Sequence, residues 1–195
     1  KERESLYQER AKAYYNAGYL EEEKEYFPDL YDLFSKVFIV KQKGRILSSI
    51  RVTEDSDVMG LPTLNYTGIK KGWDQKTVCI GRWFSNIEKG KRKVKLFIFL
   101  LVLLNIMVFL KRSKTKTVVV SSTEEVFKLL EKRGIPLQVI KIVEPNSPEN
   151  LSQAKKELSG CFKSKKVVAS KYEVNNYLIK DLLKVCISIF QYQFR

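Results

Sequence analysis

The pattern of apolar and polar residues predicts a chain of alternating strands and helices. Residues 2–18 place apolar side chains such as Leu6 and Tyr14 at helical spacing, and Gly18 can end that helix. Residues 37–41 and 46–53 are rich in β-branched and aromatic side chains, and the Lys43-Gly44 pair between them predicts a hairpin. The same reasoning predicts strands at 77–84, 116–121, 137–143 and 165–170, and helices at 28–34, 91–111, 122–134, 150–158 and 172–190.

This order of elements predicts an α/β (α+β) fold in which a mixed central sheet carries helices on both faces. We expect a single domain over residues 1–195. Its first part, 1–75, would hold the N-terminal helices, the hairpin and a long irregular connection over 54–75, where three glycines and Pro62 disfavour regular structure. The core would occupy 76–143, and 144–195 would add C-terminal helices and a possible last strand.

The longest apolar run, residues 96–110, is interrupted only by Asn105 and has basic residues on both sides. A membrane span needs about 20 apolar residues, so this run of about 15 is too short. Basic residues at both ends also give no orientation across a membrane. A helix that is apolar all round is typical of a protein core, and we therefore predict that this helix is buried.

Charge is the unusual feature of the composition, because 36 Lys and Arg against 22 Asp and Glu give a formal net charge of +14. Such a charge predicts an anionic partner: an acidic protein, a nucleic acid or anionic lipid. A basic surface that serves only solubility is the alternative. Basic residues concentrate at 89–95 and 111–116, but aromatic residues hardly alternate with them and no nucleic-acid-binding motif is present. Nucleic acid is therefore the less favoured partner.

Cysteine and histidine content narrows the possible chemistry. The three cysteines, Cys79, Cys161 and Cys186, are an odd number without metal-ligand spacing, which predicts a reducing, cytoplasmic environment and no metal site. The absence of histidine excludes a Ser-His-Asp triad, a Cys-His pair and a His-ligated zinc. Acid–base chemistry would depend on carboxylates, Tyr, Cys, Lys, water or backbone groups.

Residues 77–95 are the best candidate for a ligand site. A strand reaches Gly81 and Arg82, a basic loop follows, and the apolar helix begins directly after that loop. Strand-end backbone groups and a helix N-terminus can both donate hydrogen bonds to a phosphate. We therefore predict that a phosphate-bearing ligand binds through Trp83, Phe84, Ser85, Lys89, Lys91 and Arg92.

Residues 10–143 resemble the acyl-homoserine lactone (autoinducer) synthases, a family within the GNAT N-acyltransferase superfamily. The family's Arg-x-x-x-aromatic element matches Arg10 and Tyr14, and its Asp-x-x-Asp pair before the first strand matches Asp29 and Asp32. The arginine that ends the second strand of the family's hairpin matches Arg51. The family's next strand, helix and strand correspond to residues 118–142.

The resemblance extends to the central strand, with one departure. The family's Glu-x-x-Arg-Phe motif corresponds to Cys79-Ile-Gly-Arg82-Trp83, so a cysteine stands where the family has a glutamate proposed to help deprotonate the acceptor amine. A thiol could serve as base or nucleophile. A small buried apolar residue is the alternative role of Cys79, since no histidine exists to activate it.

The resemblance implies an N-acyltransferase that moves an acyl group from acyl carrier protein, or from acyl-CoA, to an amine acceptor such as S-adenosylmethionine. The co-substrate would be an acyl-phosphopantetheine thioester, and the net positive charge would attract an acidic carrier protein. The resemblance assigns catalysis to Arg82, Cys79, Asp29, Asp32 and Arg51, and substrate contacts to Arg10, Tyr14, Val120 and Ser121.

Two alternatives stay open at this point. Asp29 and Asp32 either form buried ion pairs with the three arginines or are solvated turn residues. The whole chain is either an acyltransferase or a basic α/β protein that binds an acyl ligand or nucleic acid without catalysis. The missing glutamate is the best argument for the non-catalytic acyl-ligand-binding protein.

Overall fold

A computed structural model describes residues 2–18, 20, 22–87, 92–132, 134–144, 165–175, 180–181 and 184. The helix predicted at 150–158 and most of the one at 172–190 lie outside these residues. The elements are the helices α1 (Glu2–Asn16), α2 (Pro62–Thr67), α3 (Arg92–Arg112) and α4 (Glu124–Lys132), the 3-10 helix η1 (Leu30–Phe34), and the strands β1 (Ser35–Gln42), β2 (Arg45–Glu54), β3 (Thr77–Ser85), β4 (Thr117–Thr123), β5 (Gln138–Val143) and β6 (Val167–Glu173).

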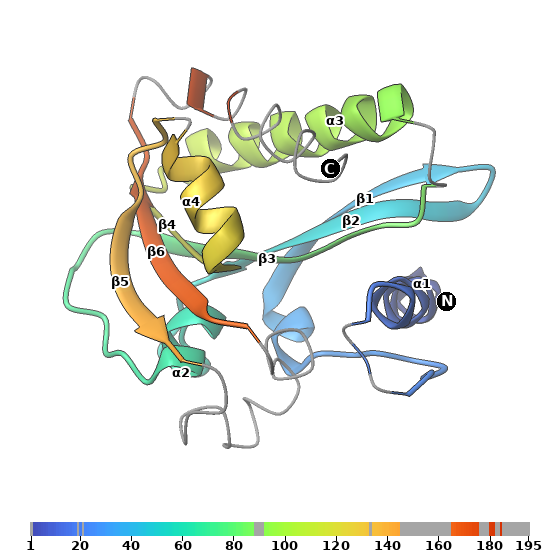
Figure 1. Ribbon diagram of the computed structural model, residues 1–195, viewed down its shortest axis with the longest axis horizontal. Coiled ribbons are helices and arrows are strands. Elements are labelled where there is room, and N and C mark those ends of the chain that lie inside the picture. The colour runs from blue at the N-terminus through green and yellow to red at the C-terminus, as the bar shows by residue number, and fades with distance from the viewer. Residues whose placement is uncertain are drawn as a thin grey trace.

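The six described strands form one mixed sheet in the order β1-β2-β3-β4-β6-β5. β3 and β4 run parallel, and the other neighbouring pairs are antiparallel. Helix α3 makes the crossover that a parallel connection requires. Helices α3 and α4 cover one face of the sheet, and α1, η1 and α2 lie on the other (Figure 1). The predicted α/β fold, a mixed central sheet with helices on both faces, is therefore confirmed, and β6 runs to Glu173, past the predicted start of the last helix.

The main core lies between α3 and the sheet. Val102, Ile106 and Leu110 of α3 are at most 1% exposed and belong to one cluster with Val52 and Val78 of the sheet. The opposite side of α3 is exposed, so the prediction of a helix buried all round is wrong for that side. A uniformly apolar helix gives no sequence signal for which face is covered. Among the described residues no helix is long and apolar enough to span a membrane.

Smaller clusters, two of which concern the site, lie apart from the main core. Leu6 and Tyr14 of α1 pack against Phe27 and Phe84, and Leu64 of α2 packs in a separate cluster that includes Cys79. Helix α2 lies in the connection that we predicted to be irregular, and this part of the prediction is wrong. A proline in its first turn and a glycine at φ 67° just after its end fit a helix, but six residues are too few to show a helical period.

Candidate functional site

The parallel strands β3 and β4 separate part of the way along the sheet. Their pairing consists of three residue pairs and ends at Cys79 and Val119. Beyond that point β3 pairs only with β2, as far as Ser85, and β4 pairs only with β6, as far as Thr123. The sheet therefore opens into a wedge between the carboxyl ends of two parallel strands, which is where α/β sheets commonly bind ligands.

A β-bulge in β3 determines which side chains face this wedge. Gly81 pairs with Arg51 and Phe84 pairs with Ser49, so Arg82 and Trp83 together lie opposite the single residue Ile50. Arg82 adopts φ 53°, a left-handed conformation that costs a non-glycine residue about 1–3 kcal/mol. In a regular strand Arg82 would face away from Cys79, because their separation is an odd number of residues. The bulge brings both side chains to the same face of the sheet.

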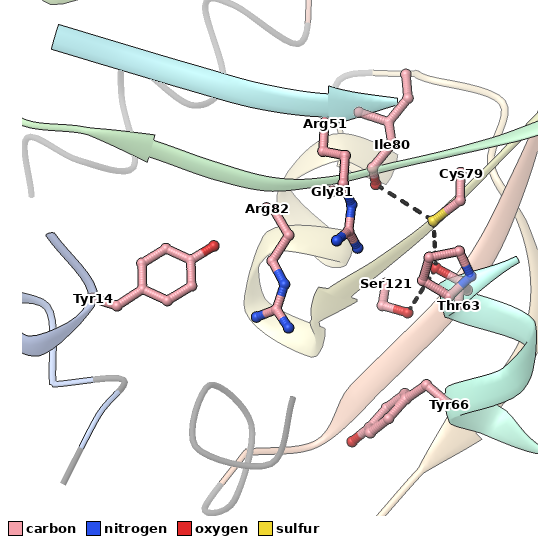
Figure 2. A pocket seen from close by; sticks show the side chains of 10 residues that line it. Tyr14, Arg51, Thr63, Tyr66, Cys79, Ile80, Gly81, Arg82 and Ser121 are labelled. Carbon is pink, nitrogen blue, oxygen red and sulfur yellow. Dashed lines mark hydrogen bonds between the residues drawn. The ribbon is translucent and has the colours of Figure 1, made fainter. Parts of the chain in front are cut away.

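A pocket lies beside the wedge, on the face of the sheet that carries α1 and α2. Figure 2 shows the guanidinium groups of Arg51 and Arg82 projecting into the same space, with Tyr14 reaching in from α1. The volume of the pocket is about 90 Å³, which is room for several water-sized groups. The lining residues come from α1, β2, α2, β3 and β4: Tyr14, Arg51, Pro62, Thr63, Tyr66, Cys79, Ile80, Gly81, Arg82 and Ser121.

A buried ionic cluster forms the wall of the pocket behind Arg51 and Arg82. Arg10 of α1 donates to Asp32 through Nη1 and Nη2, at 2.6 and 3.1 Å. Arg51 Nη1 lies 2.8 Å from Asp29 Oδ1 and 3.3 Å from Asp32 Oδ1. Arg82 donates to Asp29 Oδ2 from Nε at 2.7 Å, and its Nη2 lies 2.5 Å from the same oxygen. The cluster joins α1, η1, β2 and β3, and it excludes the alternative of solvated turn residues.

Local structure holds the two carboxylates in place. Asp29 and Asp32 form a capping box at η1, in which the Tyr31 backbone N–H donates to Asp29 and the Asp29 backbone N–H donates to Asp32. Burial raises the pKa of Asp29, but Arg82 and Arg51 outweigh that effect and lower it to about 2. Asp29 is therefore ionised at neutral pH.

Among the residues that the structure describes, the cluster carries more positive than negative charge. Arg10, Arg51 and Arg82 face two carboxylates, which leaves a net charge of +1, and each of these side chains is at most 3% exposed. A buried charge of this kind is stable only with a counter-charge or strong hydrogen bonds. Arg51 and Arg82 are the members that line the pocket, so a ligand bound there lies beside both guanidinium groups.

A chain of hydroxyl and thiol groups lies on the other side of the pocket. Ser121 Oγ donates to Thr63 Oγ1 at 3.1 Å, and Thr63 Oγ1 lies 3.2 Å from Cys79 Sγ (Figure 2). Burial raises the pKa of the Cys79 thiol, which is therefore neutral near pH 7. The burial of Cys79 and its contact with Thr63 fit a small residue of the core. They support a packing role for Cys79 rather than a role as a general base.

The structure thus brings together most of the predicted site. Trp83 instead packs against the α3 side of the sheet, Phe84 is buried against α1, and Val120 is not among the pocket residues. The pocket is lined by Gly81 and Arg82 of β3, and Trp83 is not among its residues. Lys89 and Lys91 lie outside the described residues, and so does the side chain of Arg92, whose backbone begins α3.

Sequence analysis missed the contribution of α2 to the pocket. Pro62, Thr63 and Tyr66 all line it, and all three come from the connection predicted to be irregular. The Pro62 and Gly68 pair was the available signal, since proline favours the first turn of a helix and glycine its end.

The chain shares its fold with solved acyl-homoserine lactone synthases and an N-acyl amino acid synthase, as the resemblance in sequence predicted. The chain is similar to LasI, an acyl-homoserine lactone synthase, with a TM-score of 0.59 and 15% identity over 92% of this chain and 86% of LasI. FeeM, an N-acyl amino acid synthase from uncultured soil microbes, has a TM-score of 0.62 and 11% identity over 90% of this chain and 87% of its own.

BjaI, a CoA-dependent acyl-homoserine lactone synthase solved with S-adenosylmethionine and isopentyl-CoA, has a TM-score of 0.60 and 10% identity over 94% of this chain and 81% of its own. Identities this low show a shared fold and carry no residue roles across. No sequence family matches the chain, and no curated protein matches it in sequence.

Proposed function

We propose that this protein is an N-acyltransferase, which moves an acyl group from a pantetheine thioester to an amine acceptor. The observation that carries the proposal is the separation of β3 from β4 after Cys79 and Val119, directly beside a pocket lined by two buried arginines. An extended pantetheine arm could enter between the separated strands and bring its thioester to the pocket. The net charge of +14 supports an acidic carrier protein as donor, with acyl-CoA as the alternative.

The reaction would form an amide bond and break the carbon–sulfur bond of the thioester. The acceptor nitrogen attacks the carbonyl carbon, the carbonyl oxygen gains negative charge, and the thiol leaves with the displaced electron pair and a proton. We assign the stabilisation of that oxygen to backbone N–H groups from the bulge to Ser85. The bulge supports this assignment because an extra residue leaves backbone groups outside the regular β2–β3 ladder.

The charge of the pocket favours an acceptor amine that also carries a carboxylate. Such a group would meet Arg51 and Arg82 and accept charge-assisted hydrogen bonds from their guanidinium groups. Free amino acids and S-adenosylmethionine both have an amino group beside a carboxylate, and both are acceptors of the proposed class.

Neither the two carboxylates beside the described pocket nor its thiol is suited to deprotonate the acceptor. Asp29 and Asp32 are held by arginines, and the Cys79 thiol is neutral. We therefore propose that the amine reacts in the fraction that is already neutral, or loses its proton to water. Cys79 then acts through its size and its contact with Thr63 rather than as a base.

The proposal is tested by incubating the purified protein with acyl carrier protein loaded with an acyl chain, or with acyl-CoA, and single acceptors. Mass spectrometry should detect an N-acyl product, and free thiol should appear in equal amount. Arg82→Lys keeps the charge but loses the forked geometry of the guanidinium, so the KM for a carboxylate-bearing acceptor should rise by about tenfold or more. Arg45→Lys, at a half-exposed arginine on the neighbouring strand β2, is the matched control and should leave KM unchanged.

A different outcome would identify the alternative function. If the protein binds acyl-CoA or acyl carrier protein but yields no N-acyl product with any acceptor, it is a non-catalytic acyl-ligand-binding protein. If it binds neither, but binds RNA or DNA with a steep dependence on salt, its basic surface serves nucleic acid.

A further inference from the structure

Helix α3 carries an exposed apolar ridge on the side turned away from the sheet. Its five members are spaced by three and four residues along the helix, which keeps them on one side. At a rise of about 1.5 Å per residue the ridge is about 20 Å long. An apolar patch that is both exposed and continuous commonly marks an interaction surface. The members and their exposed fractions are Val94 45%, Phe97 61%, Leu101 36%, Leu104 51% and Val108 45%.

Both ends of this ridge are rich in positive charge. Residues 92–116 contain no Asp or Glu, and Arg92, Lys93 and Lys95 stand at the N-terminal end in the sequence. None of the basic residues at the other end forms an ion pair with another residue that the structure describes. All four of these are exposed: Lys111, Arg112, Lys114 and Lys116.

We infer that the ridge of α3 binds an anionic lipid surface. The apolar side chains enter the boundary between headgroups and acyl chains, while the cations at both ends meet lipid phosphates. An exposed apolar surface flanked by Lys and Arg gains both from burial at the headgroup boundary and from attraction to anionic lipids. The helix lies in the membrane plane and does not cross the membrane, in agreement with the finding that no described helix can span one.

The charges exclude a second copy of the chain as the better occupant. Two ridges packed against each other place a cationic end of one copy against a cationic end of the other, whether the helices run parallel or antiparallel. Such like-charge contacts oppose association. A lipid surface offers anionic groups along the whole ridge, so both ends are compensated together.

The position of the ridge keeps the candidate site accessible. Helix α3 covers one face of the sheet, and the pocket lies on the other face with α1 and α2 (Figure 1). Lipid binding and acyl transfer are therefore separable properties, and variants of the ridge test the first without altering the second.

Flotation of the full-length protein with phosphatidylcholine vesicles, with and without phosphatidylserine, is the direct test. We expect binding to vesicles that contain phosphatidylserine, and loss of most of it at about 1 M salt, where charges are screened within about 3 Å. Phe97→Ser with Leu104→Ser should weaken this binding by about tenfold or more, because two exposed apolar side chains are lost from the ridge. Val58→Ser with Val139→Ser removes other exposed apolar side chains, which are 82% and 49% exposed, and should leave binding unchanged.

A second pair of variants tests the charges. Lys111→Gln with Arg112→Gln should weaken vesicle binding by about tenfold or more, because each cation near an anionic surface contributes about 1 kcal/mol to the free energy of binding. Lys12→Gln with Lys70→Gln removes the same charge from other exposed positions and should have a smaller effect. Circular dichroism before and after heating checks that all variants are folded.

Three results would overturn the inference. The first is equal binding to both kinds of vesicle, or equal binding by the ridge variant and the wild type. The second is a dimer in analytical ultracentrifugation that the ridge variant loses, without vesicle binding, which would assign the ridge to a contact between copies. The third is binding of acyl carrier protein that depends on Phe97 and Leu104 in the absence of vesicle binding, which would assign it to a protein partner.

Discussion

Replacement of Asp32 by asparagine tests whether the buried ionic cluster holds α1 onto the sheet. Asp32 accepts hydrogen bonds from Arg10 at 2.6 and 3.1 Å, from Arg51 at 3.3 Å and from the Asp29 backbone N–H at 3.1 Å. The substitution leaves three guanidinium groups facing one carboxylate, so the net charge of the cluster rises from +1 to +2.

The expected loss in the free energy of unfolding is about 3–5 kcal/mol, the range found when one partner of a buried ion pair is removed. Total stabilities of domains are about 5–15 kcal/mol, so this is a large part of the whole. For a chain of this length the melting temperature should fall by roughly 6–20 °C. The free energy is best measured by urea unfolding followed through tryptophan fluorescence, with calorimetry for the melting temperature.

Two further variants separate the electrostatic cause from a general loss of contacts. Arg10→Met with Asp32→Asn returns the cluster to a net charge of +1 and should recover part of the stability lost in Asp32→Asn. Glu54→Gln breaks the exposed ion pair of Lys36 and Glu54, in which the side chains are 62% and 39% exposed, and should cost less than about 1 kcal/mol. If Asp32→Asn costs no more than Glu54→Gln, the cluster does not hold α1 in place.

Three other predictions concern pH and the thiol. Arg82 and Arg51 outweigh burial and lower the pKa of Asp29 from 3.8 to about 2, so its carboxylate stabilises the fold fully above about pH 4 and loses this effect towards pH 2. Over that range the free energy of unfolding should fall by about 2 kcal/mol more in the wild type than in Asp29→Asn. An equal dependence on pH in the two proteins would contradict the assignment. The rate of acyl transfer should rise with pH up to the pKa of the acceptor amine, whereas a plateau near pH 6 would reveal a base in the protein. Cys79→Ala should keep kcat within about threefold and Cys79→Glu should raise it, while a hundredfold loss in a folded Cys79→Ala would show that the thiol takes part.

Signals between near neighbours were enough to predict most of the elements. The hairpin is present because Lys43 and Gly44 adopt φ 49° and 80°, as the turn requires, and α1 ends where Gly18 adopts φ 73°. The pair of aspartates before β1 and the arginines on α1, β2 and β3 were identified from the resemblance to the acyl-homoserine lactone synthases, not from local patterns. Helix α2 was missed because its six residues are too short for a period to appear.

Only the tertiary structure decided how these parts meet. The bulge at Arg82 turns that side chain to the same face as Cys79, and it depends on the register between β2 and β3 rather than on neighbouring residues. The separation of β3 from β4 likewise depends on which strands pair. Each strand continues past Cys79 or Val119 without a break, so neither sequence marks the point where the two diverge. The exposed ridge of α3 was hidden for a related reason: a helix with apolar residues on every side does not specify its buried face, and the sheet beneath it makes that choice.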